Sequence, residues 1–159
     1  PVQDFGNAFS TYVAQNFGAG KRDRIRKGMR DAVLGAFVFC AVISIFVVGF
    51  AKPLMSLFLD ESSADAVLVG VGYLRIEASF YFGIGLLFLF YGYFRAMNKP
   101  GISVILTVIS LGMRVLLAYL LSSVEAIGVI GIWMSVPIGW ILADIAGVYF
   151  YRGGNRNKG

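Results

Sequence analysis

The sequence predicts an all-α, polytopic membrane helix bundle with four full spans and a truncated leading helix. Hydrophobic residues make up 58% of the chain and charged residues only 14%, whereas a soluble domain usually carries about 25% charged residues. Several uncharged stretches reach the roughly 20 apolar residues that a helix needs to cross a bilayer. The basic residues gather between these stretches, as they do in the loops of membrane proteins.

Apolar length defines the expected spans. The stretch 5–17 is uncharged but polar and too short to cross a bilayer, so we expect it to be the end of an earlier membrane helix. Because the chain also begins at Pro1 rather than Met, we expect it to be a fragment. Full spans are expected over residues 32–51, 66–94, 101–124 and 126–151.

The distribution of basic residues predicts the orientation of the spans. Of the 14 Lys and Arg residues, eleven lie in the alternate segments 21–30, 95–99 and 152–158, which places them on one face of the membrane. Since Lys and Arg concentrate in cytoplasmic loops, that face is expected to be the cytoplasm, with both chain ends on it. Residues 18–31 are predicted as a basic cytoplasmic loop with a short amphipathic helix at the headgroups, and residues 152–159 as a cytoplasmic tail.

The composition excludes several function classes. The chain has no His and a single cysteine, Cys40, so it can form neither an internal disulfide, nor a zinc site of the usual Cys/His kind, nor a His-based catalytic triad. We therefore expect no enzyme, no metal site and no cofactor. The basic residues form no domain-wide face, which argues against nucleic acid as a partner and leaves membrane lipids as the expected surroundings.

Two patterns have structural interpretations. Small residues recur every four positions in the last span and are expected to let a neighbouring helix approach closely; they are Ser135, Gly139, Ala143 and Gly147. The segment Gln15-Asn16-Phe17-Gly18-Ala19-Gly20-Lys21 is similar to a phosphate loop but has the wrong spacing. We expect a tight turn there, with Gly18 and Gly20 at positive φ and Lys21 anchored at the headgroups.

The order and spacing of four segments resemble the MATE family of multidrug and toxic compound extrusion transporters. The resemblance covers nearly the whole chain and rests on YVAQNFGAGK at 12–21, YLRI at 73–76, RAMNKP at 95–100 and GVIGIW at 128–133. It implies that residues 1–159 are part of a six-helix C-terminal lobe, from the end of helix 8 through helix 12. The N-terminal lobe of the same protein would then be the partner of this chain.

The resemblance implies a secondary antiporter in the inner or plasma membrane, in which rocking lobes exchange a small amphiphilic, often cationic compound for Na⁺ or H⁺. Acidic groups held at membrane depth tend to mark ion or substrate paths, so Glu77 and Asp144 are candidates. Arg114 is the third candidate, because it matches an arginine that is frequent in the corresponding helix of the family. Structural alternatives remain for each. Glu77 could be an interfacial carboxylate near the extracellular side, Asp144 could pair with a base near the cytoplasmic end, and Arg114 could brace the lobe.

One departure and two alternatives limit this interpretation. The NorM branch carries a cation-binding carboxylate further along helix 10, but the corresponding residues 82–86 of this chain are apolar. The alternative is therefore coupling through acids of the other lobe, as in the DinF branch. A flippase for lipid-linked sugars would share the two-lobe architecture but requires several cations in its cavity, and the spans hold only Arg75 and Arg114. The remaining alternative is a non-transporting four-helix membrane subunit that acts through helix contacts.

Overall fold

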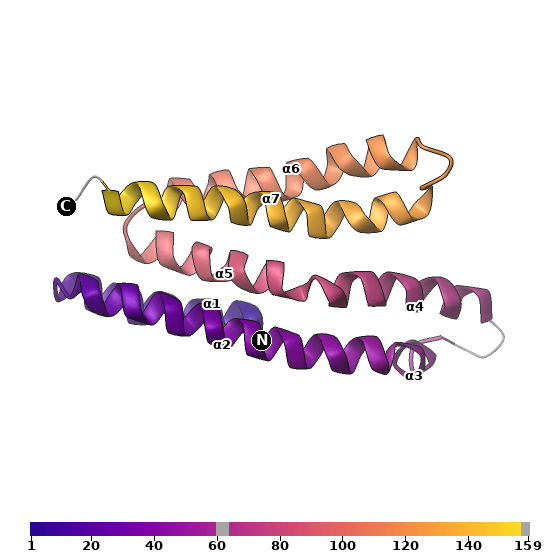
Figure 1. Ribbon diagram of the computed structural model, residues 1–159, viewed down its shortest axis with the longest axis horizontal. Helices are drawn as coiled ribbons and strands as arrows, with labels where there is room; N and C mark the ends of the chain where they lie inside the picture. The colour runs from indigo at the N-terminus through magenta and orange to yellow at the C-terminus, as the bar shows by residue number, and fades with distance from the viewer. Residues whose placement is uncertain (60–63, 157–159) are drawn as a thin grey trace.

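The computed structural model describes residues 1–59 and 64–156 of the chain, and all regular structure in these ranges is helical, which confirms the predicted all-α class (Figure 1). The helices are α1 (Val2–Gly18), α2 (Arg22–Gly49), α3 (Ala51–Ser56), α4 (Ala64–Ser79), α5 (Tyr81–Ala96), α6 (Pro100–Ser122) and α7 (Val129–Arg156).

Three of these helices, α2, α6 and α7, are individually long and apolar enough to cross a membrane. The pair α4 and α5 meets the same criteria together, as one span bent by 49°. The 17 residues of α1 extend about 25 Å, short of the roughly 30 Å of a bilayer core. The structure therefore agrees with four spans and a short leading helix.

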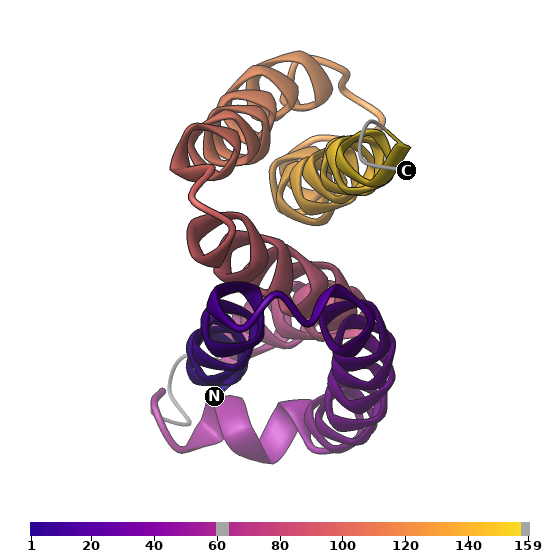
Figure 2. The same ribbon diagram turned by 90° about the vertical axis from the view of Figure 1, so that its left-hand side faces the viewer.

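Helix α5 is the centre of the bundle, because it packs against α1, α2, α6 and α7. The antiparallel pair α6 and α7 lies on one side of it, and α1 and α2 lie on the other (Figures 1 and 2). The large buried side chains at this centre come mainly from α1 and α5, and include Val13, Leu89, Phe90 and Phe94.

Glycine allows α1 and α5 to cross with their backbones in contact. A Cβ at Gly6 would lie 2.7 Å from the carbonyl oxygen of Phe88, and a Cβ at Gly92 would meet the carbonyl group of Gly6. No larger residue fits at either position without moving one helix. This close approach is the form of helix association that small residues permit inside membranes.

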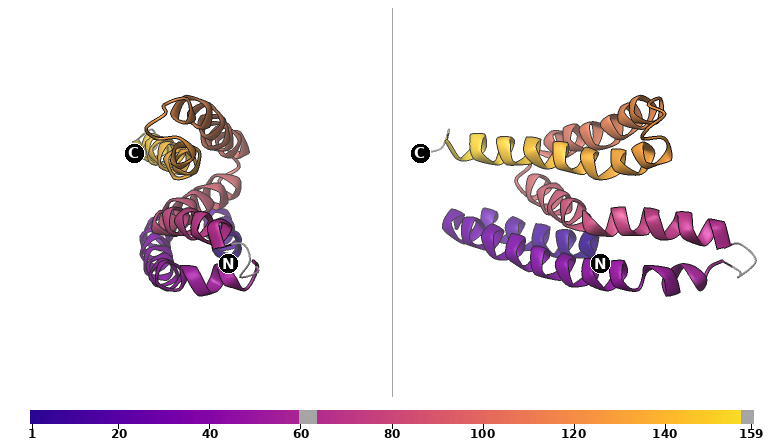
Figure 3. Two further views of the ribbon diagram at one scale, coloured as in Figure 1. Left: turned by 90° about the vertical axis from the view of Figure 1, so that its right-hand side faces the viewer. Right: turned by 45° about the vertical axis from the view of Figure 1, so that its right-hand side comes forward.

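The second predicted span is broken rather than continuous. Phe80 separates α4 from α5 with non-helical dihedrals, φ −107° and ψ 12°, and the two helices diverge by 49° (Figure 3). Two hydroxyl groups explain the break: Ser79 donates to the carbonyl of Arg75 at 2.7 Å, and Ser44 of α2 donates to the carbonyl of Ala78. Serine hydroxyls bonded to helix carbonyls commonly bend helices.

Two turns at the same end of the bundle use one capping geometry. After α1, the amide of Lys21 donates to the carbonyl of Asn16 and that of Gly20 to Phe17, with Gly20 at φ +69°. After α5, Lys99 and Asn98 repeat the pattern, with Asn98 at φ +56°. Both are Schellman caps, which require a left-handed residue.

Several predicted boundaries are wrong. Gly18 is the last residue of α1 and has no positive φ, so only Gly20 takes the expected conformation. Within the segment 18–31, α2 begins at Arg22, so the expected amphipathic entry helix is continuous with the first full span. The expected tail 152–159 is helical as far as Arg156, where α7 ends; residues 157–159 lie outside the described ranges.

Candidate functional site

A few buried polar atoms have no hydrogen-bond partner in the described part of the chain. Among the described residues they are Glu77 Oε1, Arg114 Nε and Asp144 Oδ1. Nearly all buried polar groups in proteins are paired, so each unpaired one calls for an explanation. These atoms belong to the three charged residues that the sequence selected, and they come from α4, α6 and α7.

Asp144 lies at membrane depth on α7, ten residues before Gly154, or about 15 Å along the helix. Its side chain is only 8% exposed. An open cavity of about 600 Å³ adjoins it between α2, the break and α7. Except for Asp144 and Ser79, the lining is apolar or glycine: Phe37, Phe80, Phe82, Gly83, Leu86, Ile141, Ile145 and Val148.

A glycine on α5 makes room for this carboxylate. A Cβ at Gly83 would lie 3.7 Å from Asp144 Oδ2 and 3.3 Å from the Cβ of Trp140. An added Cβ at Gly83 would thus be in ordinary contact with the acid and tight against Trp140, so Gly83 lets α7 lie close to the start of α5. The pairing with a base that the sequence left open for Asp144 is not found among the described residues.

Glu77 and Arg114 form a separate pair of opposite charges. Glu77 is half-buried and lies thirteen residues into α4, or about 20 Å from its start. Arg114 of α6 lies within electrostatic reach but not within ion-pair distance. Tyr73, whose ring packs at 6.0 Å against Trp133, stands beside both charges. The two charges thus face each other across a gap.

The glycine turn lies far from these charges, at the end of the bundle. Asn16 is buried and its side-chain amide donates to the carbonyl of Tyr12 at 2.9 Å. Gly18 has open space around it, and Gln15 accepts a backbone hydrogen bond from Ala19. Together with Gly20 and Lys21, these residues close α1 and start α2, so their role in the described structure is that of a turn.

The small residues of α7 divide between two neighbours. A Cβ at Gly139 would lie 2.6 Å from the carbonyl oxygen of Ser110 on α6. A Cβ at Gly147 would lie 2.5 Å from the ring of Phe90 on α5. Ser135, one turn before Gly139, and Ala143, between the two glycines, are also buried. The small residues therefore pack the first half of α7 against α6 and the second half against α5.

Sequence reasoning missed the residues that create the break and the space beside it, Ser44, Ser79 and Gly83. Serine within an apolar helix was the available signal, since its hydroxyl can bond a carbonyl one turn back. In the part of the chain that the structure describes, no three His, Cys, Asp or Glu side chains come together to hold a metal ion.

The fold and the buried charges define a polytopic membrane protein with one broken span and buried charged groups on α4, α6 and α7. The comparison with protein families gives a more specific result: the model of the MatE family matches residues 1–120, and the chain belongs to this family. The resemblance inferred from the sequence motifs is thereby confirmed.

Two relatives agree with this assignment. The chain is similar to the "Probable multidrug resistance protein YoeA" of Bacillus subtilis, with 23% identity over 156 residues, which are 96% of this chain and 33% of that protein. It is also similar to the "FAD transporter" of Shewanella oneidensis, with 29% identity over 150 residues, which are 93% of this chain and 32% of that protein. The chain thus spans about a third of the length of these relatives, whose names point to a transporter rather than an enzyme. No solved structure matches.

Proposed function

We propose that the complete protein containing this chain is a secondary antiporter of the cell membrane, which exports amphiphilic or cationic compounds in exchange for Na⁺ or H⁺. The observation that carries the proposal is Asp144, buried beside the break with no hydrogen-bond partner for Oδ1 among the described residues. The match to the MatE family and the name of the Bacillus relative support the same class.

The coupling follows from the cost of a charge at membrane depth. An ionised, unpaired carboxylate is expensive there, and a bound proton or Na⁺ removes much of that cost. A cation that binds one conformation better than another shifts the population toward it. Because Asp144 faces the break between α4 and α5, a cation bound at this carboxylate would act on the point where the central span changes direction. The N-terminal lobe would supply the opposite wall of the transport path.

The chemistry beside the break favours a cationic substrate over an anionic one. The Shewanella relative is named for FAD, which carries a diphosphate, and the flippase alternative would also require a diphosphate site. Among the residues that line the cavity at Asp144, the carboxylate is the ionisable group, and it repels phosphate. Membership of the MatE family likewise favours a transporter over a non-transporting subunit.

The test is efflux of a cationic dye from cells that express the complete protein, with the sodium and proton gradients collapsed separately. Asp144→Asn keeps the shape of the side chain and removes its charge, so we expect efflux to fall by about tenfold or more, a magnitude corresponding to the loss of one charged interaction. Glu77→Gln tests the second buried acid in the same assay. Glu125→Gln, at an exposed loop carboxylate, is the matched control and is expected to retain full efflux.

Two outcomes decide the proposal. Efflux that stops when one gradient is collapsed identifies the coupling ion and supports antiport. If Asp144→Asn and Glu125→Gln transport equally well at equal protein levels, Asp144 has no part in coupling and the proposal loses its main observation.

A further inference from the structure

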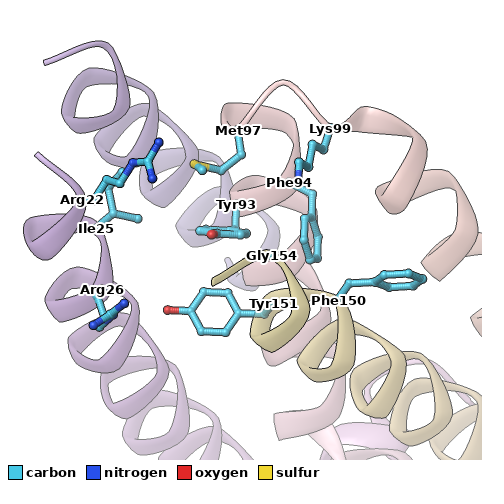
Figure 4. A pocket seen from close by; sticks show the side chains of 10 residues that line it. All are labelled: Arg22, Ile25, Arg26, Tyr93, Phe94, Met97, Lys99, Phe150, Tyr151 and Gly154. Atoms are coloured by element: carbon cyan, nitrogen blue, oxygen red, sulfur yellow. The ribbon is translucent and has the colours of Figure 1, made fainter. Parts of the chain in front are cut away.

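A second polar site lies at the end of the bundle that carries the two Schellman turns. It is a pocket between the start of α2, the end of α5 and the end of α7 (Figure 4). Its volume is about 100 Å³. The lining residues are Arg22, Ile25, Arg26, Tyr93, Phe94, Met97, Lys99, Phe150, Tyr151 and Gly154.

Three cations converge on this pocket. Arg22 and Arg26 reach it from α2, and Lys99 reaches it from the turn before α6 (Figure 4). No carboxylate contributes to the lining, and no ion pair in the described part of the chain involves any of the three. The pocket is therefore a site for an anion.

Local structure holds the three cations in place. Burial of Ile25 fixes how α2 is rotated about its axis. Arg22 and Arg26 project from one face of α2, because they are four residues apart. The Schellman turn at Asn98 fixes Lys99, whose Nζ lies 3.8 Å from where a Cβ of Gly154 would be. The rings of Tyr93 and Tyr151, which also line the pocket, pack against each other with their centroids 5.0 Å apart.

Size selects the kind of anion. The volume of about 100 Å³ is well below the roughly 300–1,000 Å³ of pockets that hold drug-sized ligands. The pocket can hold a phosphate group but not a drug-sized ligand. Arginine and lysine are the residues that proteins use to hold phosphate.

An apolar groove continues from this pocket toward the middle of the bundle. It shares Arg26 and Tyr151 with the pocket and has a volume of about 500 Å³. It opens between α2 and α7, which both pack against α5 but have little direct contact in the described structure. Its further lining is Met29, Arg30, Val33, Leu34, Phe37 and Phe82.

The length of the groove matches one leaflet of a bilayer. Arg26 and Phe37 are eleven residues apart on α2, which corresponds to about 16 Å of helix. Half of a bilayer core of about 30 Å has the same length. The charged end lies where the sequence places the cytoplasmic headgroups, and the cytoplasmic leaflet carries anionic lipids that attract clustered Lys and Arg.

We propose that this pocket and groove bind an anionic phospholipid of the cytoplasmic leaflet. The phosphate lies among Arg22, Arg26 and Lys99, and one acyl chain follows the groove between α2 and α7. The phosphate pocket shares no residue with the cavity at Asp144, and the groove meets that cavity at Phe37 and Phe82. The proposal does not depend on the transport function.

The test uses the complete protein, purified in a neutral detergent. Its thermal unfolding is measured with added phosphatidylglycerol, with phosphatidylcholine and with inorganic phosphate, because a ligand that binds the folded state raises the unfolding temperature. We expect phosphatidylglycerol to stabilise the protein at lower concentration than either of the others. Phosphatidylglycerol with short acyl chains is expected to bind more weakly, because it leaves the groove unfilled.

Charge-matched variants locate the site. Arg22→Gln, Arg26→Gln and Lys99→Gln together are expected to weaken phosphatidylglycerol binding on the order of a hundredfold, at about fivefold for each cation. The matched control replaces three exposed basic residues of the same end that do not line the pocket, Arg24→Gln, Lys27→Gln and Arg152→Gln, and is expected to stay within about twofold of the unmodified protein. If the triple variant does not fold, Lys99→Gln alone is expected to lose about fivefold.

Three results would overturn the proposal. Equal losses in the two triple variants would mean general attraction to a basic surface. Equal stabilisation by inorganic phosphate and phosphatidylglycerol would mean a phosphate site without a lipid chain. No stabilisation by any lipid would mean that the groove is closed in the complete protein, for instance by a segment outside this chain.

Discussion

Replacing Gly92 with alanine tests whether the α1 to α5 crossing is as close as the structure shows. The added Cβ would meet the carbonyl group of Gly6, whose carbon would be 3.3 Å away and whose oxygen would be closer still. Since the atoms in contact belong to the two backbones, the helices must separate. A gap of 0.5–1 Å removes about a quarter to a half of the dispersion energy of each contact. Overpacking of this kind costs about 1–3 kcal/mol.

The measurement is thermal unfolding of the complete protein in detergent, with Gly112→Ala as the matched control. Gly112 is helical and exposed, with nothing within 4 Å of the place that an added Cβ would take, so alanine there is expected to be neutral or stabilising by up to about 1 kcal/mol. For a protein about three times the length of this chain, we expect Gly92→Ala to lower the Tm by about 3 °C. Equal Tm values for the two variants would refute the close crossing.

Further predictions concern the turn, the break and the orientation. Gly20→Ala forces a side chain to φ +69° and is expected to cost about 1 kcal/mol, whereas Gly18→Ala, in open helical space, is expected to cost nothing; equal Tm values would contradict the assigned cap. Ser44→Ala removes the hydrogen bond to the carbonyl before the break and is expected to lower stability by about 1 kcal/mol, measured by the same unfolding. Lys27→Cys and Ser123→Cys, in a background without the native cysteine, are expected to react with an impermeant thiol reagent from opposite sides of the membrane, and labelling from one side would contradict the predicted orientation.

The fold class and the spans could be predicted because they depend on local composition. An uncharged run of about 20 residues can satisfy its backbone in a bilayer only as a helix, so the spans that contain Cys40 and Arg114 were found from hydropathy alone. The boundary at Arg22 was missed because a basic segment is equally compatible with a loop and with the first turns of a helix. The break at Phe80 was missed because no proline marks it.

The candidate charges were also found from the sequence, but their surroundings were not. An acid in an apolar run is conspicuous at any position, which is why Glu77 and Asp144 were selected. Whether such an acid has a partner depends on residues from other helices. In the described structure Arg114 faces Glu77 across a gap, and Asp144 faces a cavity beside Gly83.

The sequence by itself determined that this protein is a helical membrane bundle of the MATE type, because hydropathy, charge bias and motif order are properties of consecutive residues. The tertiary structure alone decided which helices touch and what lies between them. The hydroxyl of Ser44 reaches a carbonyl 34 residues away, and Arg22 and Lys99 meet in one pocket although they are far apart in the sequence. Such contacts depend on how rigid helices cross, and helix crossing is set by packing over the whole bundle rather than by any single segment.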